Sequence, residues 1–291
     1  MQKTNLAISS KAEISAIYFA LLQCGYDYNA MEKDARLISK LEYYRSQQNP
    51  HPLSFFSKIK QNTCGVYPYW PRAAVLEEAT FYLNKSYTGF VQFTQLKKRI
   101  MSAGNISPKE KGKDLWDWIT QFPEAVKDVL VSSPFLSYLS WERSWIAEQS
   151  EIFREELKNL QTILQQCNAL YGSQLDGIHV LMNPIKCAYS SDHYEYGGHF
   201  YFSLGWFRKE SILHELLHPV IHSYVMRMRD EILHYQGSFP DIDESYRLDG
   251  SDAGRLNAAE EYLVRALTER VVCGVLPNDL SQFVQDKMNK L

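Results

Sequence analysis

The strongest restriction on the fold comes from residues 212–225, ILHELLHPVIHSYV. Its apolar residues recur at the three- and four-residue spacing of a helix. His214, His218 and His222 follow one another at intervals of four, so in a helix their side chains share one face. Buried polar groups need hydrogen-bond partners, so an apolar helix seldom carries three imidazoles on one face. The segment therefore predicts a helix whose histidines face a metal ion or polar partners.

Residues 214–218 form the pattern His-Glu-x-x-His. Because His214 and His218 lie one helical turn apart, both can bind the same metal ion. Glu215 lies about 100° around the helix from His214, where it can reach a metal-bound water without being a ligand. Zinc-dependent hydrolysis needs neutral imidazoles that hold the ion and a carboxylate that takes a proton. We expect two zinc ligands and a general base here; the alternative is a partly buried helix with hydrogen-bonded histidines.

His222 continues the same face, but it is too far away to complete the metal site. In a helix it lies about 12 Å along the axis from His214. Zinc–nitrogen bonds are only about 2 Å long, so three imidazoles at these positions cannot converge on one ion. Pro219, just past His218, favours a kink that moves His222 further from that line. We place His222 in the surroundings of the site, with ordinary packing as the alternative.

A third ligand therefore has to come from another segment. The zinc pattern with a further histidine six residues after the second one is absent, because Tyr224 occupies that position. The remaining common solution is a glutamate from a later helix. Residues 256–271, LNAAEEYLVRALTERV, offer Glu260 and Glu261 in an otherwise apolar helix, where a carboxylate needs a cation. We favour Glu261, which has Arg265 one turn further on; an ordinary surface Glu–Arg pair is the alternative.

The predicted secondary structure changes near residue 173. Helical periodicity and helix boundaries dominate before it, at residues 11–23, 31–48, 71–83, 122–131 and 136–172, the last as one helix or two that close at Gly172. After it, two short segments rich in β-formers predict strands joined by a loop; these are residues 176–185 and 197–205. Helix returns near Lys209, followed by a polar loop at 235–255 that is long enough for a lid and by helices from about 256 to 273 and from about 278 onward. We expect an α+β fold, mostly α, with a helical region at 1–172 and a region at 173–291 that holds the small sheet and the histidine helix.

Composition limits the class of protein and its partners. The chain has 291 residues, is 45% hydrophobic and carries a formal net charge of -3, which fits one large domain or two modest ones. The near-neutral charge gives no reason to expect nucleic acid or an anionic membrane as a partner. We find neither a signal-peptide pattern nor the roughly 18 uninterrupted apolar residues of a membrane span. Five cysteines, at 24, 64, 167, 187 and 273, are an odd number without CxxC spacing, so we expect reduced thiols and a cytoplasmic protein, with the oligomeric state left open.

With HELLH at 214–218 and EYLVRA at 261–266, the chain resembles the gluzincin type of zinc metallopeptidase, in particular poorly characterised bacterial proteins of this kind. The resemblance covers about residues 175–275. It implies a zincin-like catalytic part, a Zn2+ cofactor held by His214, His218 and Glu261, and Glu215 as the general base. It also implies a peptide or protein substrate that adds to an edge strand ahead of the active helix; residues 183–190 or 197–205 would supply this strand.

The sequence departs from the gluzincin pattern in one respect that concerns the metal site. Gluzincins often carry an aspartate four residues after the ligand glutamate, where it binds a ligand histidine. Arg265 occupies that position, so the partner that orients the histidine is unassigned. Candidates for stabilising a charged tetrahedral species are Tyr246, Tyr262, His199 and His234.

The function that we expect is hydrolysis of peptide bonds by a zinc-dependent metallopeptidase. One alternative is a zincin-like scaffold that binds or regulates a protein without proteolysis. Another is a metal-free helical interaction module. The presence of Glu215 favours the enzyme, because a scaffold that only binds has no evident need for a base at this position.

Overall fold

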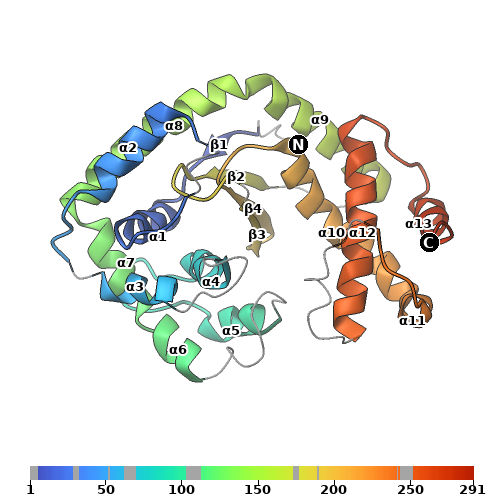
Figure 1. Cartoon of the computed structure of the whole chain (residues 1–291), viewed down its shortest axis with the longest axis horizontal. Coiled ribbons are helices and arrows are strands. Elements are labelled where there is room, and N and C mark those ends of the chain that lie inside the picture. The colour runs from blue at the N-terminus through green and yellow to red at the C-terminus, as the bar shows by residue number, and fades with distance from the viewer. Residues whose placement is uncertain are drawn as a thin grey trace. The chain divides into compact units, whose positions relative to one another are not determined.

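The computed structural model describes residues 6–28, 33–51, 53–61, 70–102, 113–172, 177–188, 190–240, 242 and 252–291. The fold is α+β and mostly α, as expected, with one four-stranded sheet (Figure 1). The chain forms two compact units: unit 1 comprises residues 1–6, 153–178 and 208–291, and unit 2 comprises residues 7–152 and 179–207. This division differs from the expected boundary between residues 172 and 173. The reason is that the strands after residue 178 pack with the N-terminal helices, whereas the helix before Gly172 packs with the histidine helix.

Unit 2 is organised around the helix α1 (Ala12–Gln23), whose sequence AEISAIYFALLQ is apolar on nearly every side. Its central residues 14–22 are all buried, so neighbours have to cover it on several faces. The helices that contact it are α2 (Ala35–Arg45), α3 (Ser54–Gln61), α4 (Trp70–Thr80), α7 (Phe122–Leu130) and α8 (Ser133–Ile152). Two further helices, α5 (Phe93–Ser102) and α6 (Lys113–Ile119), complete the helical part of this unit. The helices expected at 11–23, 31–48, 71–83 and 122–131 are therefore confirmed, with α2 shorter than its segment.

The sheet of unit 2 has the strand order β1-β2-β4-β3. β1 (Ile8–Ser9) pairs in parallel with β2 (Ile178–Met182), and β3 (Ser191–Tyr196) pairs antiparallel with β4 (His199–Leu204). The hairpin between β3 and β4 turns at Gly197 and Gly198, whose φ angles of 61° and 78° suit a two-residue turn. The loop expected between the two strands is wrong in part, because residues 191–196 form β3. β4 has strands on both sides, so residues 197–205 do not supply the free edge that was expected to pair with a substrate.

A charged group lies in the core of unit 2 and explains why β3 has a buried aspartate. Lys186 is completely buried, and its Nζ lies 2.9 Å from Glu77 Oε1 on α4 and 2.6 Å from Asp192 Oδ2 on β3. Ser203 Oγ on β4 lies 3.1 Å from the same nitrogen. Burial lowers the pKa of Lys186, but the charges of the two carboxylates outweigh burial and raise it. The ammonium group thus joins α4 to both strands of the hairpin.

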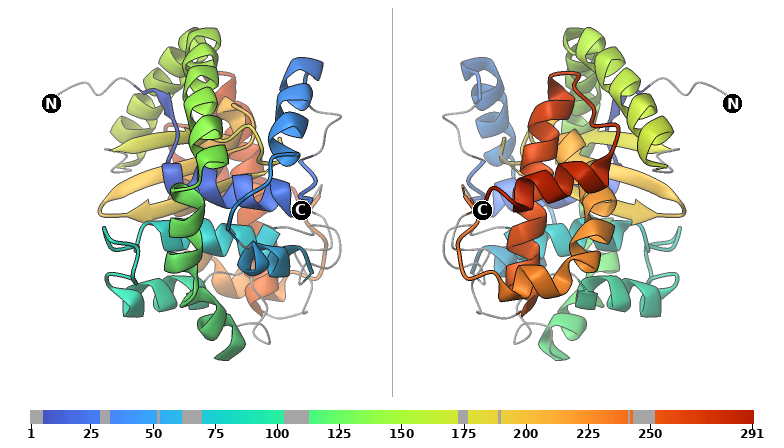
Figure 2. Two further views of the ribbon diagram at one scale, coloured as in Figure 1. Left: turned by 90° about the vertical axis from the view of Figure 1, so that its left-hand side faces the viewer. Right: turned by 90° about the vertical axis from the view of Figure 1, so that its right-hand side faces the viewer.

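Unit 1 contains the helices α9 (Arg154–Tyr171), α10 (Lys209–Arg227), α11 (Arg229–His234), α12 (Asp252–Val272) and α13 (Leu280–Met288). The segment at 136–172 is two helices, α8 and α9, and α9 ends at Gly172 in the left-handed conformation with φ 65°. α10 packs mainly on α12, and α9 and α11 also contact α10 (Figure 2). α10 and α12 run in opposite directions: His214 near the start of α10 contacts Glu261 in the middle of α12, and Arg229 just after α10 contacts Asp252 at the start of α12. Residues 241 and 243–251 of the expected loop at 235–255 lie outside the described residues, and α12 begins at Asp252, earlier than expected.

None of the helices in the described ranges combines the length and the apolar character that crossing a membrane requires. The described cysteines, Cys24, Cys167, Cys187 and Cys273, are free thiols. Cys64 lies outside the described residues.

Candidate metal centre

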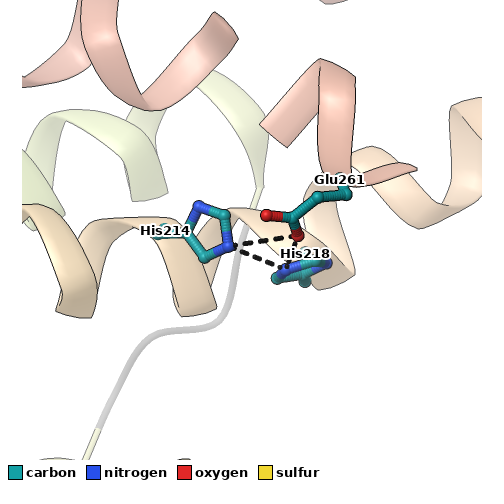
Figure 3. A group of neighbouring side chains, drawn as sticks. All are labelled: His214, His218 and Glu261. Atoms are coloured by element: carbon teal, nitrogen blue, oxygen red, sulfur yellow. Dashed lines mark hydrogen bonds and ion pairs between the residues drawn. The ribbon is translucent and has the colours of Figure 1, made fainter. Parts of the chain in front are cut away.

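Three candidate ligands from two helices of unit 1 come together. His214 and His218 lie one turn apart on α10, and Glu261 reaches toward both of them from α12 (Figure 3). His214 Nε2 and His218 Nε2 are 3.2 Å apart. Glu261 Oε2 lies 3.4 Å from the first nitrogen and 3.6 Å from the second. One oxygen and two nitrogens therefore form a nearly equilateral triangle.

The size of this triangle is compatible with a tetrahedral metal ion. Zinc ligands at about 2.0–2.1 Å from the ion lie about 3.3–3.4 Å from one another in tetrahedral geometry. The separations of 3.2, 3.4 and 3.6 Å bracket that value. The two nitrogen–oxygen distances exceed the usual range of about 2.7–3.2 Å for an N–H···O hydrogen bond. The donor set, two imidazoles and one carboxylate, is also one that zinc prefers.

Glu261 is held in this position by Arg265, one turn further along α12. Arg265 Nε donates to Glu261 Oε1 at 2.7 Å, and this leaves Oε2 for the imidazoles. The Glu261 side chain is only 6% exposed. Burial raises the pKa of Glu261, but His214 and Arg265 outweigh burial and lower the pKa to about 2. The carboxylate is thus ionised and available as a ligand throughout the neutral range.

Glu260 points to the other side of His218. Its Oε1 lies 2.9 Å from His218 Nδ1, and its Oε2 lies 2.8 Å from His222 Nδ1. Burial raises the pKa of Glu260, whereas the hydrogen bonds from the two histidines lower it, and the net pKa is below the usual value. Burial lowers the pKa of His218, but the hydrogen bond to Glu260 and the charges of the nearby glutamates outweigh burial and raise it. Glu260 and Glu261 therefore contact opposite nitrogens of one imidazole.

Glu215 follows His214 directly on α10 and is partly exposed. Its negative charge is one of those that raise the pKa of His218, so it contributes to the field at the site. Pro219 lies inside α10, one residue after His218, and has no N–H to donate within the helix. The charges of three carboxylates, Glu215, Glu260 and Glu261, act on His218, and Glu261 is also paired with the Arg265 guanidinium.

The structure brings together the three predicted ligands, His214, His218 and Glu261. The predicted base, Glu215, is the residue next to His214 on α10. His222 lies outside the triangle and contacts Glu260, the residue that was the second choice as a ligand. Glu260 contacts His218 Nδ1, the nitrogen of that imidazole that lies away from the triangle. Glu260 and Glu261 were both candidates in the sequence. No sequence pattern indicated that one would contact Nδ1 of His218 and the other Nε2.

The candidates for stabilising a charged tetrahedral species lie at different places. Tyr262 is partly exposed on α12 and contacts the Phe239 ring. His234 is exposed, with its Nδ1 2.6 Å from the carbonyl oxygen of Asp230 in its own helix. His199 belongs to β4 of unit 2, where its Nδ1 lies 3.0 Å from His179 Nε2. Tyr246 lies outside the described residues.

Comparisons with known protein families, with curated proteins and with solved structures find no match to this chain.

Proposed function

We propose that this protein is a zinc-dependent metallopeptidase that hydrolyses peptide bonds, with His214, His218 and Glu261 as metal ligands and Glu215 as general base. The observation that carries the proposal is the triangle of ligand atoms, with sides of 3.2, 3.4 and 3.6 Å. A further carboxylate, Glu215, follows His214 on α10. The resemblance of HELLH and EYLVRA to gluzincin motifs supports the same reading. The substrate is a peptide or a protein.

Each side chain of the site has a distinct task in this proposal. A bound zinc ion would lower the pKa of a water molecule and polarise the carbonyl of the scissile bond. Glu215 accepts the proton of the attacking water and returns it to the nitrogen of the leaving amine. Arg265 keeps Glu261 ionised and fixes which of its oxygens faces the two imidazoles. His214 and His218 would hold the ion through their Nε2 atoms.

The substitution Glu215→Gln tests the division between binding and chemistry. We expect this variant to keep one zinc ion per chain, because Glu215 is not a ligand, and to lose peptide hydrolysis by at least about 100-fold, because general-base catalysis contributes about that much or more. Metal content is measured by elemental analysis of protein purified without chelator. Hydrolysis is measured on a broad library of fluorogenic peptides. Glu210→Gln, an exposed glutamate on the same helix, is the matched control and should change neither quantity.

Two other results would change the proposal in different ways. If His214→Ala binds zinc as tightly as the unmodified chain, the metal site is wrong. If the unmodified chain binds zinc tightly but cleaves no member of the library, a zinc-containing scaffold for protein binding replaces the peptidase. Unchanged turnover in Glu215→Gln would remove the proposed base.

A further inference from the structure

We propose that Glu260 and His222 are positioning residues for the metal centre: they hold His218 in the one tautomer and ring orientation that present its Nε2 lone pair to the metal. This inference rests on the proposed metal site, but it concerns residues outside the ligand set. It assigns a role to the third histidine of the helix, which the ligands leave unused.

The tautomer of His218 follows from its partners. A carboxylate accepts hydrogen bonds and donates none, so the 2.9 Å contact with Glu260 Oε1 requires the proton of His218 to be on Nδ1. In a neutral imidazole the other nitrogen then carries a lone pair. That nitrogen, Nε2, is the one that lies 3.2 Å from His214 Nε2 and 3.6 Å from Glu261 Oε2. Glu260 thus selects the form of His218 that can bind a metal.

His222 fixes Glu260 in turn. A glutamate side chain is flexible, and one hydrogen bond leaves its carboxylate free to rotate. Here the second oxygen of Glu260 also has a partner, because His222 Nδ1 lies 2.8 Å from Oε2. With both oxygens engaged by histidines one turn apart on α10, the carboxylate is held along the helix and away from the metal position. Ordinary packing does not account for His222, because 61% of its side chain is exposed.

Partners that orient ligand histidines commonly contribute 10- to 100-fold to metal affinity, and this sets the scale of the test. We expect Glu260→Ala to keep one metal ion per chain at saturation but to weaken Zn2+ binding by about 10- to 100-fold. His222→Ala should weaken it less, and His222→Asn should restore most of the loss, because the asparagine amide places an N–H donor near the position of Nδ1. Zn2+ affinity is measured by competition with a chromophoric chelator. The visible absorption of the Co2+-substituted protein reports the geometry, and we expect it to change in Glu260→Ala.

The controls separate this inference from the proposed metal site. Glu269→Ala removes an exposed glutamate from the same helix and should leave both the affinity and the Co2+ spectrum unchanged. Glu260→Gln keeps the volume of the side chain and one acceptor, so it serves if the alanine variant does not fold, and it should also bind Zn2+ more weakly. Wild-type affinity and spectrum in the Glu260 variants, with binding lost in His214→Ala, would overturn the positioning role and leave the metal site intact. No Zn2+ binding by the unmodified chain would overturn both. Complete loss of the ion in Glu260→Ala with retention in Glu261→Ala would make Glu260 a ligand and overturn the positioning role.

Discussion

At the scale of single residues, Glu142 is a buried acid whose protonation affects stability. It lies on α8 with no exposed surface. Its oxygens accept hydrogen bonds from Ser15 Oγ at 2.6 Å and from Tyr138 Oη and Asn183 Nδ2 at 2.9 Å. Burial raises the pKa of Glu142 more than these hydrogen bonds lower it, and the result is a pKa of about 7 against 4.5 for an ordinary glutamate. The folded protein therefore holds a proton that the unfolded chain releases.

This proton makes stability depend on pH in a defined direction. Below pH 4.5 both states carry the proton, and between 4.5 and about 7 only the folded state does, so the free energy of unfolding falls as the pH rises. Glu142→Gln cannot ionise, and its amide suits the same three partners. From pH 5 to pH 8 we expect the variant to gain about 2–3 kcal/mol of stability relative to the unmodified chain, as two units of pKa at about 1.4 kcal/mol each imply.

Denaturant unfolding of both proteins at the two pH values measures this change. Glu148→Gln, on the same helix and half exposed, is the control, and we expect it to shift stability by less than about 0.5 kcal/mol at either pH. A constant difference between Glu142→Gln and the unmodified chain from pH 5 to pH 8 would mean that Glu142 titrates alike in both states.

The candidate site was partly predictable from single residues. The spacing of His214 and His218 determines that they share a helix face, because helix geometry is local. The choice between Glu261 and Glu260 depends on how α12 is rotated against α10, and no local pattern encodes that rotation. The pairing of Glu260 with His222 depends on the same rotation. The sequence therefore identifies the candidate residues, whereas the packing of α12 on α10 determines which histidine nitrogens Glu260 and Glu261 contact.

At the scale of elements, the long periodic helices and the strands β2 and β4 were predictable from the sequence, whereas β1 and β3 were not. The sequence of α1 is apolar on nearly every side, and this alone predicts that the helix is buried. β1 has two residues and exists through its pairing with Val180 and Leu181, which are more than 170 positions away. In β3 the buried face carries Asp192, which looks like a loop residue until Lys186 is known to neutralise it. β1 is too short to show a periodic pattern, and the charged residues of β3 hide its alternation of buried and exposed positions.

The end of β4 offers a test of how tightly the sheet region packs. Gly205 lies against the segment before β3, where an added Cβ would lie 1.9 Å from the carbonyl oxygen of Cys187. Backbone cannot give way as a flexible side chain can, so we expect Gly205→Ala to lower the free energy of unfolding by about 2–4 kcal/mol. The control is Gly89→Ala, where the nearest atom would be 3.8 Å from the new Cβ. Chemical denaturation of both variants decides this, and equal stabilities would show that the Cys187 segment moves freely.

At the scale of the whole molecule, the division into two units determines what a bound metal can stabilise. The proposed ligands His214, His218 and Glu261 belong to unit 1, as do Glu260 and Arg265, which contact them. A ligand that binds only the folded state stabilises whatever must unfold to release it, by about 2.7 kcal/mol when its concentration is 100 times its dissociation constant. If unit 1 opens independently, this stabilisation should be confined to its own helices.

Hydrogen exchange, followed peptide by peptide, measures that confinement. At Zn2+ 100 times above its dissociation constant, we expect amides in α10 and α12 that exchange by unfolding to slow by about 100-fold, the factor that corresponds to 2.7 kcal/mol. Amides in α1 and α8 of unit 2 should keep their rates, since no proposed ligand lies there. A chelator should reverse the effect, and His214→Ala should abolish it. Equal slowing in both units would mean that the chain unfolds as one cooperative body, because the metal could then be released only when all of it opens.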